Sequence, residues 1–235
     1  MLYPKIETLY ERDKETFKVD PDRVCLLEVD LIKQWLVTEK IDGTNIRVVI
    51  RPGGVSVGMV AAGDIIATTV EFRGRTDRAQ VPPFLLTRLE EMITPLLCDI
   101  AFPDLSIEEV ILYGEGYGAR IQKGGGNYRE GVSFRLFDVA VDTRGEGNYL
   151  WLDWENVEDI AQKLGIETVP VLCISANLAA AVSCVSSFSA VAKQDGGNPA
   201  TICEGIVART EPLLCDRRGR RLMWKLKGKD FATNA

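Results

Sequence analysis

The segment TEKIDGTN, residues 38–45, places a lysine two residues before an Asp-Gly pair, between two runs rich in β-branched and apolar residues. Asp-Gly-Thr-Asn is typical of a break between extended segments, so we expect Lys40 at a turn. A protonated lysine is a poor nucleophile, and cationic neighbours or desolvation are what make a lysine amine reactive. A reactive lysine at this position would therefore need partners from elsewhere in the sequence.

A second group of lysines lies near the end of the sequence, in MWKLKGK. Lys225 and Lys227 are two residues apart, so in an extended chain they project from one face while Trp224 and Leu226 project from the other. Two lysines on one face could bind a triphosphate and also lower the pKa of a third lysine. A lone K-x-K is more typical of an edge strand whose lysines discourage aggregation.

Carboxylates supply the complementary charges. Glu115 in LYGEGYG and Glu204 in CEGIVAR stand beside glycines, which let a backbone or a ligand approach closely. Each glutamate alone could also be an ordinary turn residue. In FRLFDV the aromatic Phe137 precedes Asp138, and taken alone that phenylalanine fits a core position.

The sequence of 235 residues contains no histidine. This excludes Ser-His-Asp and Cys-His catalysis, histidine-ligated zinc and acid-base chemistry through imidazole. The six cysteines are scattered without a C-x-x-C pair, which favours reduced thiols over a zinc ribbon or a redox motif. Any chemistry must use Lys, Arg, Asp and Glu, and phosphoryl transfer is a reaction that needs no histidine.

Charge is distributed unevenly along the chain. The net charge of −6 taken alone disfavours a polyanionic partner, yet residues 205–235 hold eight basic and three acidic residues. No apolar run reaches the roughly 18 residues of a membrane-spanning helix, and the first residues lack the apolar stretch of a signal peptide. We therefore expect a cytoplasmic protein with no membrane partner.

Helical and extended patterns follow one another along the chain. We predict helices over residues 81–101, 153–165 and 177–194. Pro95 should stop or kink the first helix, while Asp153 caps the second and Gly165 follows its end. Extended segments are predicted at about residues 26–38, 46–51, 55–60, 109–116, 133–141, 168–174, 202–210 and 221–231. This order predicts one α+β domain with a mostly antiparallel sheet.

Six short motifs, taken together and in order, resemble the collinear motifs of the covalent nucleotidyltransferases, the ligases and capping enzymes that form a lysine-nucleotide adduct. They are KIDGTN (40–45), FRGRT (72–76), LYGEGYG (112–118), FRLFDV (134–139), EGIVA (204–208) and KLK (225–227). The asparagine of KIDGTN, the GRT segment and the ARIQK after GEGYG look most like ATP-dependent RNA ligases of the phage nick-sealing type. Capping enzymes tend to have arginine where Asn45 stands.

The resemblance spans residues 38–227 and implies a fold of antiparallel sheets flanked by helices around a nucleotide cleft, the ATP-grasp-like nucleotidyltransferase domain of ligases. It implies that Lys40 attacks the α-phosphate of ATP and carries AMP. Glu204 would hold Mg²⁺ (or Mn²⁺) or orient the lysine, while Lys225 and Lys227 bind the α-phosphate through its transition state. The nucleotide-binding residues implied are Glu39 beside the adenine, Asn45 for the later sealing step, Arg75 at the ribose or phosphates, Glu115 at the ribose or the water shell of the metal, and Phe137 stacked on the base.

The implied reaction has three steps. Lys40 takes AMP from ATP and releases pyrophosphate, AMP passes to a 5′-phosphate of RNA, and a 3′-hydroxyl displaces AMP to form the phosphodiester. The partners would be ATP and RNA ends or a nicked duplex. The basic tail and the loop residues Arg120, Lys123 and Arg129 would contact the nucleic-acid backbone.

Ligases of this class usually carry an OB-fold or a small helical domain after the last motif. We expect residues 1–235 to be a single adenylation domain without either, which would act as a minimal ligase or with an accessory RNA-binding domain or protein in trans. Three alternatives remain open at this point: a DNA ligase, a GTP-dependent capping guanylyltransferase of the same superfamily, and a catalytically silent nucleic-acid-binding module.

Overall fold

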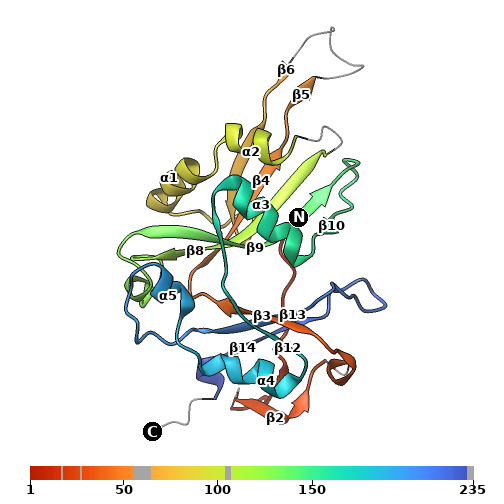
Figure 1. Cartoon of the computed structure of the whole chain (residues 1–235), viewed down its shortest axis with the longest axis vertical. Helices are drawn as coiled ribbons and strands as arrows, with labels where there is room; N and C mark the ends of the chain where they lie inside the picture. The colour runs from red at the N-terminus through yellow and green to blue at the C-terminus, as the bar shows by residue number, and fades with distance from the viewer. Residues whose placement is uncertain (17, 27, 56–64, 104–106, 232–235) are drawn as a thin grey trace. The chain divides into compact units, whose positions relative to one another are not determined.

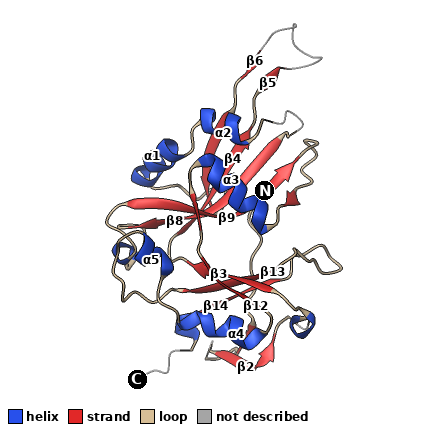
Figure 2. Ribbon diagram, viewed as in Figure 1, coloured by secondary structure: helices blue, strands red, loops and turns tan. Residues whose placement is uncertain are grey.

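A computed structural model describes residues 1–16, 18–26, 28–55, 65–103 and 107–231 of this chain. The chain forms two compact units, each built around its own sheet (Figures 1 and 2). Unit 1 comprises residues 1–3, 43–123 and 131–168, and unit 2 comprises residues 4–42, 124–130 and 169–235. The sheets are mainly antiparallel and carry few helices, so the predicted α+β class is confirmed.

Unit 1 contains a six-stranded sheet with strand order β10-β9-β8-β4-β7, to which β11 adds a parallel pairing with β9. Its strands are β4 (Thr44–Arg51), β7 (Thr69–Gly74), β8 (Glu109–Gly118), β9 (Val132–Asp142), β10 (Leu150–Trp151) and β11 (Glu167–Thr168). The short strands β5 (Gly54–Val55) and β6 (Ile65–Ile66) pair with each other. The predicted strand at 55–60 lies outside the described residues from residue 56 onward.

The helices of unit 1 follow the sequence pattern closely. They are α1 (Pro83–Met92), α2 (Pro95–Ala101) and α3 (Trp154–Leu164), and α1 and α3 pack against β9. The predicted helix over 81–101 breaks before Pro95, which opens α2 because proline has no N–H to lose at a first helical position. Asp153 caps α3 by accepting a hydrogen bond from the backbone N of Asn156, and Gly165 ends the helix with φ of 67°, as predicted.

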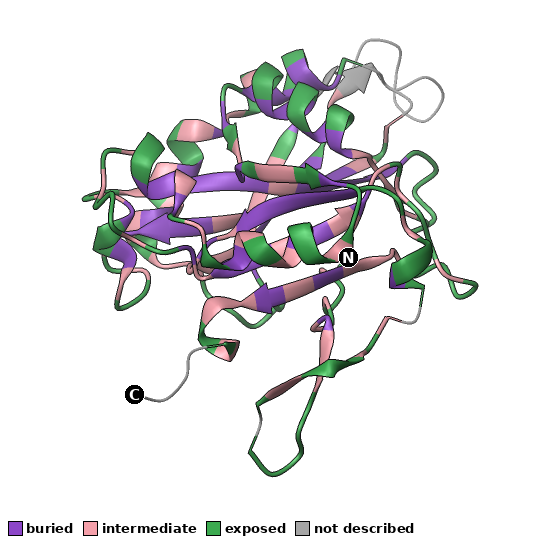
Figure 3. Ribbon diagram, turned by 60° about the horizontal axis from the view of Figure 1, so that its bottom comes forward, coloured by how far each residue is buried: buried purple, intermediate pink, exposed green. Residues whose placement is uncertain are grey.

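Unit 2 contains a four-stranded sheet with strand order β12-β3-β13-β14. These strands are β3 (Trp35–Lys40), β12 (Val171–Ser175), β13 (Gly205–Thr210) and β14 (Met223–Lys227). Two strands that precede β3 in the sequence, β1 (Tyr10–Arg12) and β2 (Val19–Val24), pair with each other in a separate sheet. Alternate residues of the central strands belong to one apolar core. Its largest members are Trp35, Trp224, Ile206 and Leu226. Figure 3 colours the buried residues of the chain purple. The opposite face of these strands is mixed, because it carries the buried Leu36 and also Lys40, Lys225 and Lys227.

The helices of unit 2 are short. They are η1 (Val29–Leu31), η2 (Gly125–Asn127), α4 (Leu178–Ser183), η3 (Cys184–Ser186), α5 (Ala190–Gln194) and η4 (Gly228–Asp230). The single helix predicted over 177–194 is wrong, because Phe188 pairs with Ile202 in an isolated antiparallel bridge and Ser189 starts a new helix by capping Ala192. The extended segment predicted at 26–38 is wrong over η1 and right from Trp35 onward.

None of the helices in the described part of the chain is both long and apolar enough to cross a membrane.

Candidate active site

Strand register in unit 2 brings Lys40 and Lys227 to one row. Lys40 is the last residue of β3 and is the register partner of Gly205 in β13, which in turn is the partner of Lys227 in β14. The strand ends directly after Lys40, and the next strand, β4, begins only at Thr44 and belongs to the other sheet. The predicted break within KIDGTN is confirmed, and Lys40 stands at a strand end beside two other strands.

Glu204 joins the two lysines of this row. The Nζ of Lys40 donates to its Oε2, and the Nζ of Lys227 donates to its Oε1 at 2.6 Å. The Glu204 side chain is only 16% exposed, so both ion pairs lie where water screens them weakly. One carboxylate therefore holds two ammonium groups in fixed positions.

The pKa of Glu204 reflects this arrangement. Burial acts to raise the pKa of the carboxyl group, but the ammonium groups of Lys40 and Lys227 outweigh burial and hold the pKa below its ordinary value. A carboxylate with a lowered pKa is a weak proton acceptor. Glu204 is thus better suited to orient the lysines than to act as a general base.

Gly205 is required by the close approach of the strands. A Cβ atom at this position would lie 2.0 Å from the carbonyl oxygen of Leu226 and 2.8 Å from the Cα of Lys227. Both are backbone atoms of β14, so no side-chain movement could make room. The glycine after Glu204 thus sets how near β14, with Lys227, comes to β13.

Lys225 lies on the same face of β14 as Lys227, because the residues between and before them, Leu226 and Trp224, are buried in the core. The predicted one-face arrangement is confirmed. The backbone of Lys225 bonds to the segment before β1, with its N donating to the Glu7 carbonyl at 3.0 Å and its carbonyl accepting from the Leu9 N at 3.2 Å. This part of β14 is therefore covered rather than a free edge.

Glu39, which the resemblance places beside the adenine, is 1% exposed. Its Oε1 accepts a hydrogen bond from the Ser189 hydroxyl at 2.5 Å, and its Oε2 accepts one from the Val191 N at 3.0 Å. The carboxylate thereby ties β3 to the start of α5, one residue before Lys40. This structural role is what the contacts establish, and contact with a base stays a prediction.

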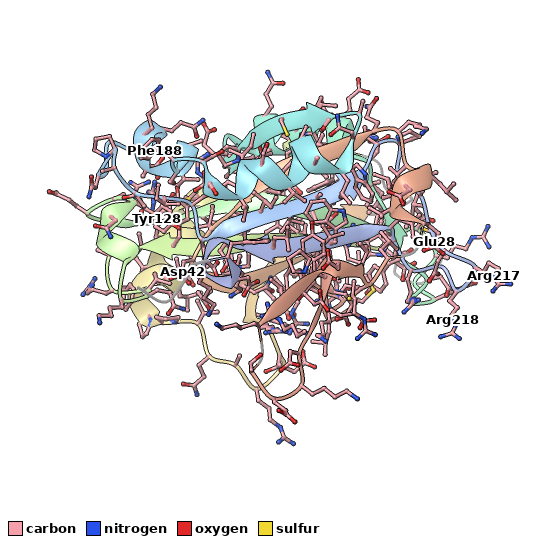
Figure 4. All side chains as sticks on the ribbon, turned by 90° about the horizontal axis from the view of Figure 1, so that it is seen from below. Glu28, Asp42, Tyr128, Phe188, Arg217 and Arg218 are labelled. Atoms are coloured by element: carbon pink, nitrogen blue, oxygen red, sulfur yellow. The ribbon has the colours of Figure 1, made fainter. Side chains whose placement is uncertain are left out.

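Two further groups adjoin residues of this site, Tyr128 through Asp42 and Cys203 as the residue before Glu204. The hydroxyl oxygen of Tyr128 accepts a hydrogen bond from the Asp42 backbone N at 3.2 Å, which fixes the turn after Lys40 (Figure 4). Burial raises the pKa of the Tyr128 phenol well above its usual range, so it stays protonated. Burial also raises the pKa of the Cys203 thiol to about 11, which leaves Cys203 unreactive beside Glu204.

The remaining predicted residues belong to unit 1. Asn45 and Glu115 are register partners across β4 and β8, so the structure brings these two together. Their strand face is opposite to Gly116, whose Cβ would meet Leu85 of α1 at 2.6 Å. The Oδ1 of Asn45 is buried and has no hydrogen-bond partner among the described residues. A buried acceptor without a donor indicates a position where a ligand could bind.

Phe137 is the extra residue of a β-bulge, because Tyr113 pairs with Asp138 while Gly114 pairs with Leu136. Its ring packs edge-on against that of Tyr3, with 5.1 Å between centroids. Arg75 is exposed just after β7. Stacking of Phe137 on a base and binding of phosphate by Arg75 stay predictions.

The acidic side chains of the predicted site limit how a metal ion could be bound. The described residues include no cluster of three or more acidic or cysteine side chains placed to hold one, and both oxygens of Glu204 already bond to lysines. Mg²⁺ is commonly held by one or two carboxylates together with substrate phosphates. Glu204 in unit 2 and Glu115 in unit 1 each offer one carboxylate, which fits an ion that arrives with a triphosphate.

Sequence reasoning missed two residues of this site. Tyr128 fixes the turn after Lys40, and Ser189 holds Glu39. The close backbone approach expected at the glycine beside Glu204 is confirmed at Gly205. The tyrosine of GGGNYR and the serine of SFSAV gave no comparable signal, because their contacts join segments about 86 and 150 residues apart.

Comparison with protein families gives one match, to the family described as RNA ligase, over residues 33–227. The chain belongs to the RNA ligase family. The matched range contains every residue of the lysine row together with Glu204, Asn45 and Glu115. The predicted resemblance to RNA ligases is thereby confirmed. A search among curated proteins finds no match.

Solved structures of ligases share the fold at low sequence identity. A variant of Naegleria gruberi RNA ligase with ATP and Mn is 17% identical, with a TM-score of 0.56 over 98% of this chain and 60% of that one. Naegleria gruberi RNA ligase with PPi is 17% identical, with a TM-score of 0.55 over 97% of this chain and 62% of that one. A putative ATP-dependent DNA ligase from Aquifex aeolicus is 18% identical, with a TM-score of 0.52 over 95% and 49%. This RNA ligase family member thus spans less than two thirds of each neighbour.

Proposed function

We propose that this chain is an ATP-dependent RNA ligase adenylation domain, in which Lys40 becomes the carrier of AMP. The observation that carries the proposal is the Lys40–Glu204–Lys227 arrangement, held by the register of three strands. One lysine at a strand end with a second cation and an orienting carboxylate beside it is what nucleotidyl transfer to an amine requires.

In the proposed step, the Lys40 Nζ first releases a proton to solvent, its lone pair then attacks the α-phosphorus of ATP, and a second proton leaves the nitrogen for solvent as the phosphoramidate forms. The N–P bond forms, the bond from the α-phosphorus to the bridging oxygen breaks, and pyrophosphate leaves with the bonding electrons. Glu204 orients the Nζ atom, while the ammonium of Lys227 lies beside it and opposes the negative charge of the phosphates. A divalent cation arriving with the triphosphate would neutralise the rest of its charge.

The finer parts of the proposal concern the substrate. AMP would pass from Lys40 to a 5′-phosphate of RNA, and a 3′-hydroxyl would then displace it. Asn45 and Glu115 on the unit 1 sheet would serve the nucleotide and the sealing step. Membership in the RNA ligase family supports RNA over DNA as the substrate.

The test is incubation with Mg²⁺ or Mn²⁺ and α-labelled ATP or GTP, followed by denaturing electrophoresis and mass spectrometry of the labelled peptide. We expect label from ATP on Lys40, and no label on a Lys40→Ala variant that unfolds at the wild-type temperature. Label from GTP alone would instead indicate a capping guanylyltransferase, and label on the Lys40→Ala variant would refute the assignment. Absence of label from either nucleotide would favour a silent nucleic-acid-binding module.

Adenylated protein should then be offered nicked duplexes with RNA or DNA at the 3′-hydroxyl side. Faster sealing of RNA is the expected result. Equal or faster sealing of nicks made wholly of DNA would indicate a DNA ligase instead.

A further inference from the structure

The connection between β13 and β14 contains a concentrated positive charge. Its residues 215–221, CDRRGRR, include four arginines and one aspartate in a chain of net charge −6. We call this segment the arginine turn. It begins and ends with an isolated antiparallel bridge between Cys215 and Arg221, so it closes the hairpin that carries Gly205 and Lys227 at its other end.

The arginine turn has a fixed shape. The Asp216 carboxylate accepts hydrogen bonds from the Arg218 N at 2.8 Å and the Arg220 N at 2.9 Å. The backbone N of Asp216 donates to the Arg220 carbonyl at 2.8 Å. Gly219 takes the left-handed conformation, with φ of 75°, that the reversal needs. These backbone bonds hold the pKa of Asp216 below its ordinary value, so the carboxylate is charged and bonded at neutral pH.

The same aspartate leaves two arginines unpaired. Asp216 also binds the side chain of Arg220, with 2.7 Å from Nε to Oδ2, and so the only acid of the turn is occupied. Arg217 and Arg218 are exposed and form no ion pair with any residue that the structure describes. Figure 4 shows both side chains extending away from the ribbon. Two exposed guanidinium groups are therefore presented on one hydrogen-bonded turn.

Unpaired, preorganised guanidinium groups fit phosphate. Arginine binds phosphate oxygens through two parallel N–H donors, and little conformational entropy is lost when the turn is already ordered. The partner must be a polyanion with closely spaced charges, because one exposed phosphate contact contributes little at physiological salt. A phosphodiester backbone is a polyanion whose charges are closely spaced.

We propose that the arginine turn is a contact surface for the phosphodiester backbone of the nucleic acid, at a distance from the end that is joined. Arg221 and Lys227 are six residues apart, so at about 3.3 Å per residue of extended chain they lie roughly 20 Å apart, β14 covering the part from Met223 onward. At about 3.4 Å per base pair this corresponds to roughly six base pairs between the reacting end and the turn. The distance to the reacting end rests on the proposed function, whereas binding of the backbone does not.

The test compares two double variants of equal charge change. Arg217→Ala with Arg218→Ala removes the proposed contacts and keeps the Asp216 bonds, which use the backbone N of residue 218. The matched control is Lys14→Ala with Arg144→Ala, two exposed residues that make no ion pair among the described residues. Both proteins should keep the wild-type unfolding temperature and form the lysyl adduct at the wild-type rate.

Binding to a nicked duplex is then measured against salt. Each lost phosphate contact lowers the slope of log K against log[salt] by about 0.9 for duplex DNA, so the arginine variant should lose about 1.8. Its affinity deficit should shrink about tenfold between about 50 and about 200 mM salt. Arg217→Lys with Arg218→Lys should restore most of the slope, because each lysine still neutralises one phosphate.

Duplex arm length tests the position of the contact. With arms of about 14 base pairs the arginine variant should bind more weakly than the control, and with arms of about 4 base pairs the two should bind equally, because the short arm ends before the turn. Equal affinity and slope on long arms would overturn the proposal. Equal deficits on both arms would overturn the position of the contact. If the wild-type protein forms no adduct while the arginine variant still shows the expected loss of affinity and slope, the result would count against the proposed function alone.

Discussion

Replacing Gly205 by alanine tests whether strand spacing positions the lysine row. The new Cβ would lie 2.0 Å from the Leu226 carbonyl oxygen, whereas ordinary contacts begin at 3.4 Å, so β13 and β14 would have to separate by about 1.4 Å. A displacement of about 1 Å at reacting groups can cost about 100-fold in rate. Overpacking of this kind also costs about 1–3 kcal/mol of folding stability.

Gly126→Ala is the matched control, because a Cβ at Gly126 has nothing within 4 Å and the residue lies in the same unit. The assay measures the initial rate of label transfer from α-labelled ATP to Lys40, at a temperature well below the unfolding midpoint of each variant. We expect the rate of Gly205→Ala to fall about 100-fold and that of Gly126→Ala to stay near wild type.

The reasoning would be refuted if Gly205→Ala formed the adduct at the wild-type rate and unfolded at the wild-type temperature. That result would mean that the lysines need no fixed spacing between the strands. A large loss of stability with an unchanged adduct rate would place the role of the glycine in folding alone.

Three further predictions concern stability. The pKa of Glu204 is lowered in the folded state, so its ion pairs stabilise the protein above the ordinary carboxyl pKa, and this contribution disappears as pH falls through the lowered value. Glu204→Gln should therefore flatten the fall in unfolding free energy below about pH 5, measured by denaturant titration. Arg47→Ala should cost about 2–4 kcal/mol, because Arg47 is 2% exposed and bonds to the Gly74 carbonyl, while the exposed Arg51→Ala should cost less than about 1 kcal/mol. Asp153→Ala should cost about 1 kcal/mol through loss of the α3 cap, and an unchanged midpoint in urea would contradict that role.

Local signals in the sequence were sufficient for much of unit 1. The start and end of α3 follow from Asp153 and Gly165, whose preferences for capping and for positive φ act within one turn of the helix. The predicted helix over 177–194 fails for the opposite reason. Its small residues are compatible with a helix, but the pairing of Phe188 with Ile202 is a tertiary contact that no local pattern carries.

The candidate site divides in the same way. The residue types of Lys40, Glu204 and Lys227, read with their motifs, predicted that these three act together, and their ion pairs in unit 2 agree with that. The bulge that sets the direction of Phe137 could not be predicted, because a bulge depends on which residue of the partner strand is opposite.

Strand register is also what keeps the charged groups of unit 2 in place. A slip of β14 by one residue would turn Trp224 and Leu226 out of the core and bring Lys225 and Lys227 into it. Exposing two such side chains costs about 1.5–3 kcal/mol each, and burying two ammonium groups without partners costs several kcal/mol more. The total is comparable with the whole stability of a typical domain, about 5–15 kcal/mol. The apolar core of unit 2 therefore fixes the position of Lys227 against Glu204 and Lys40, and the proposed chemistry on one face of this sheet depends on the packing of the other.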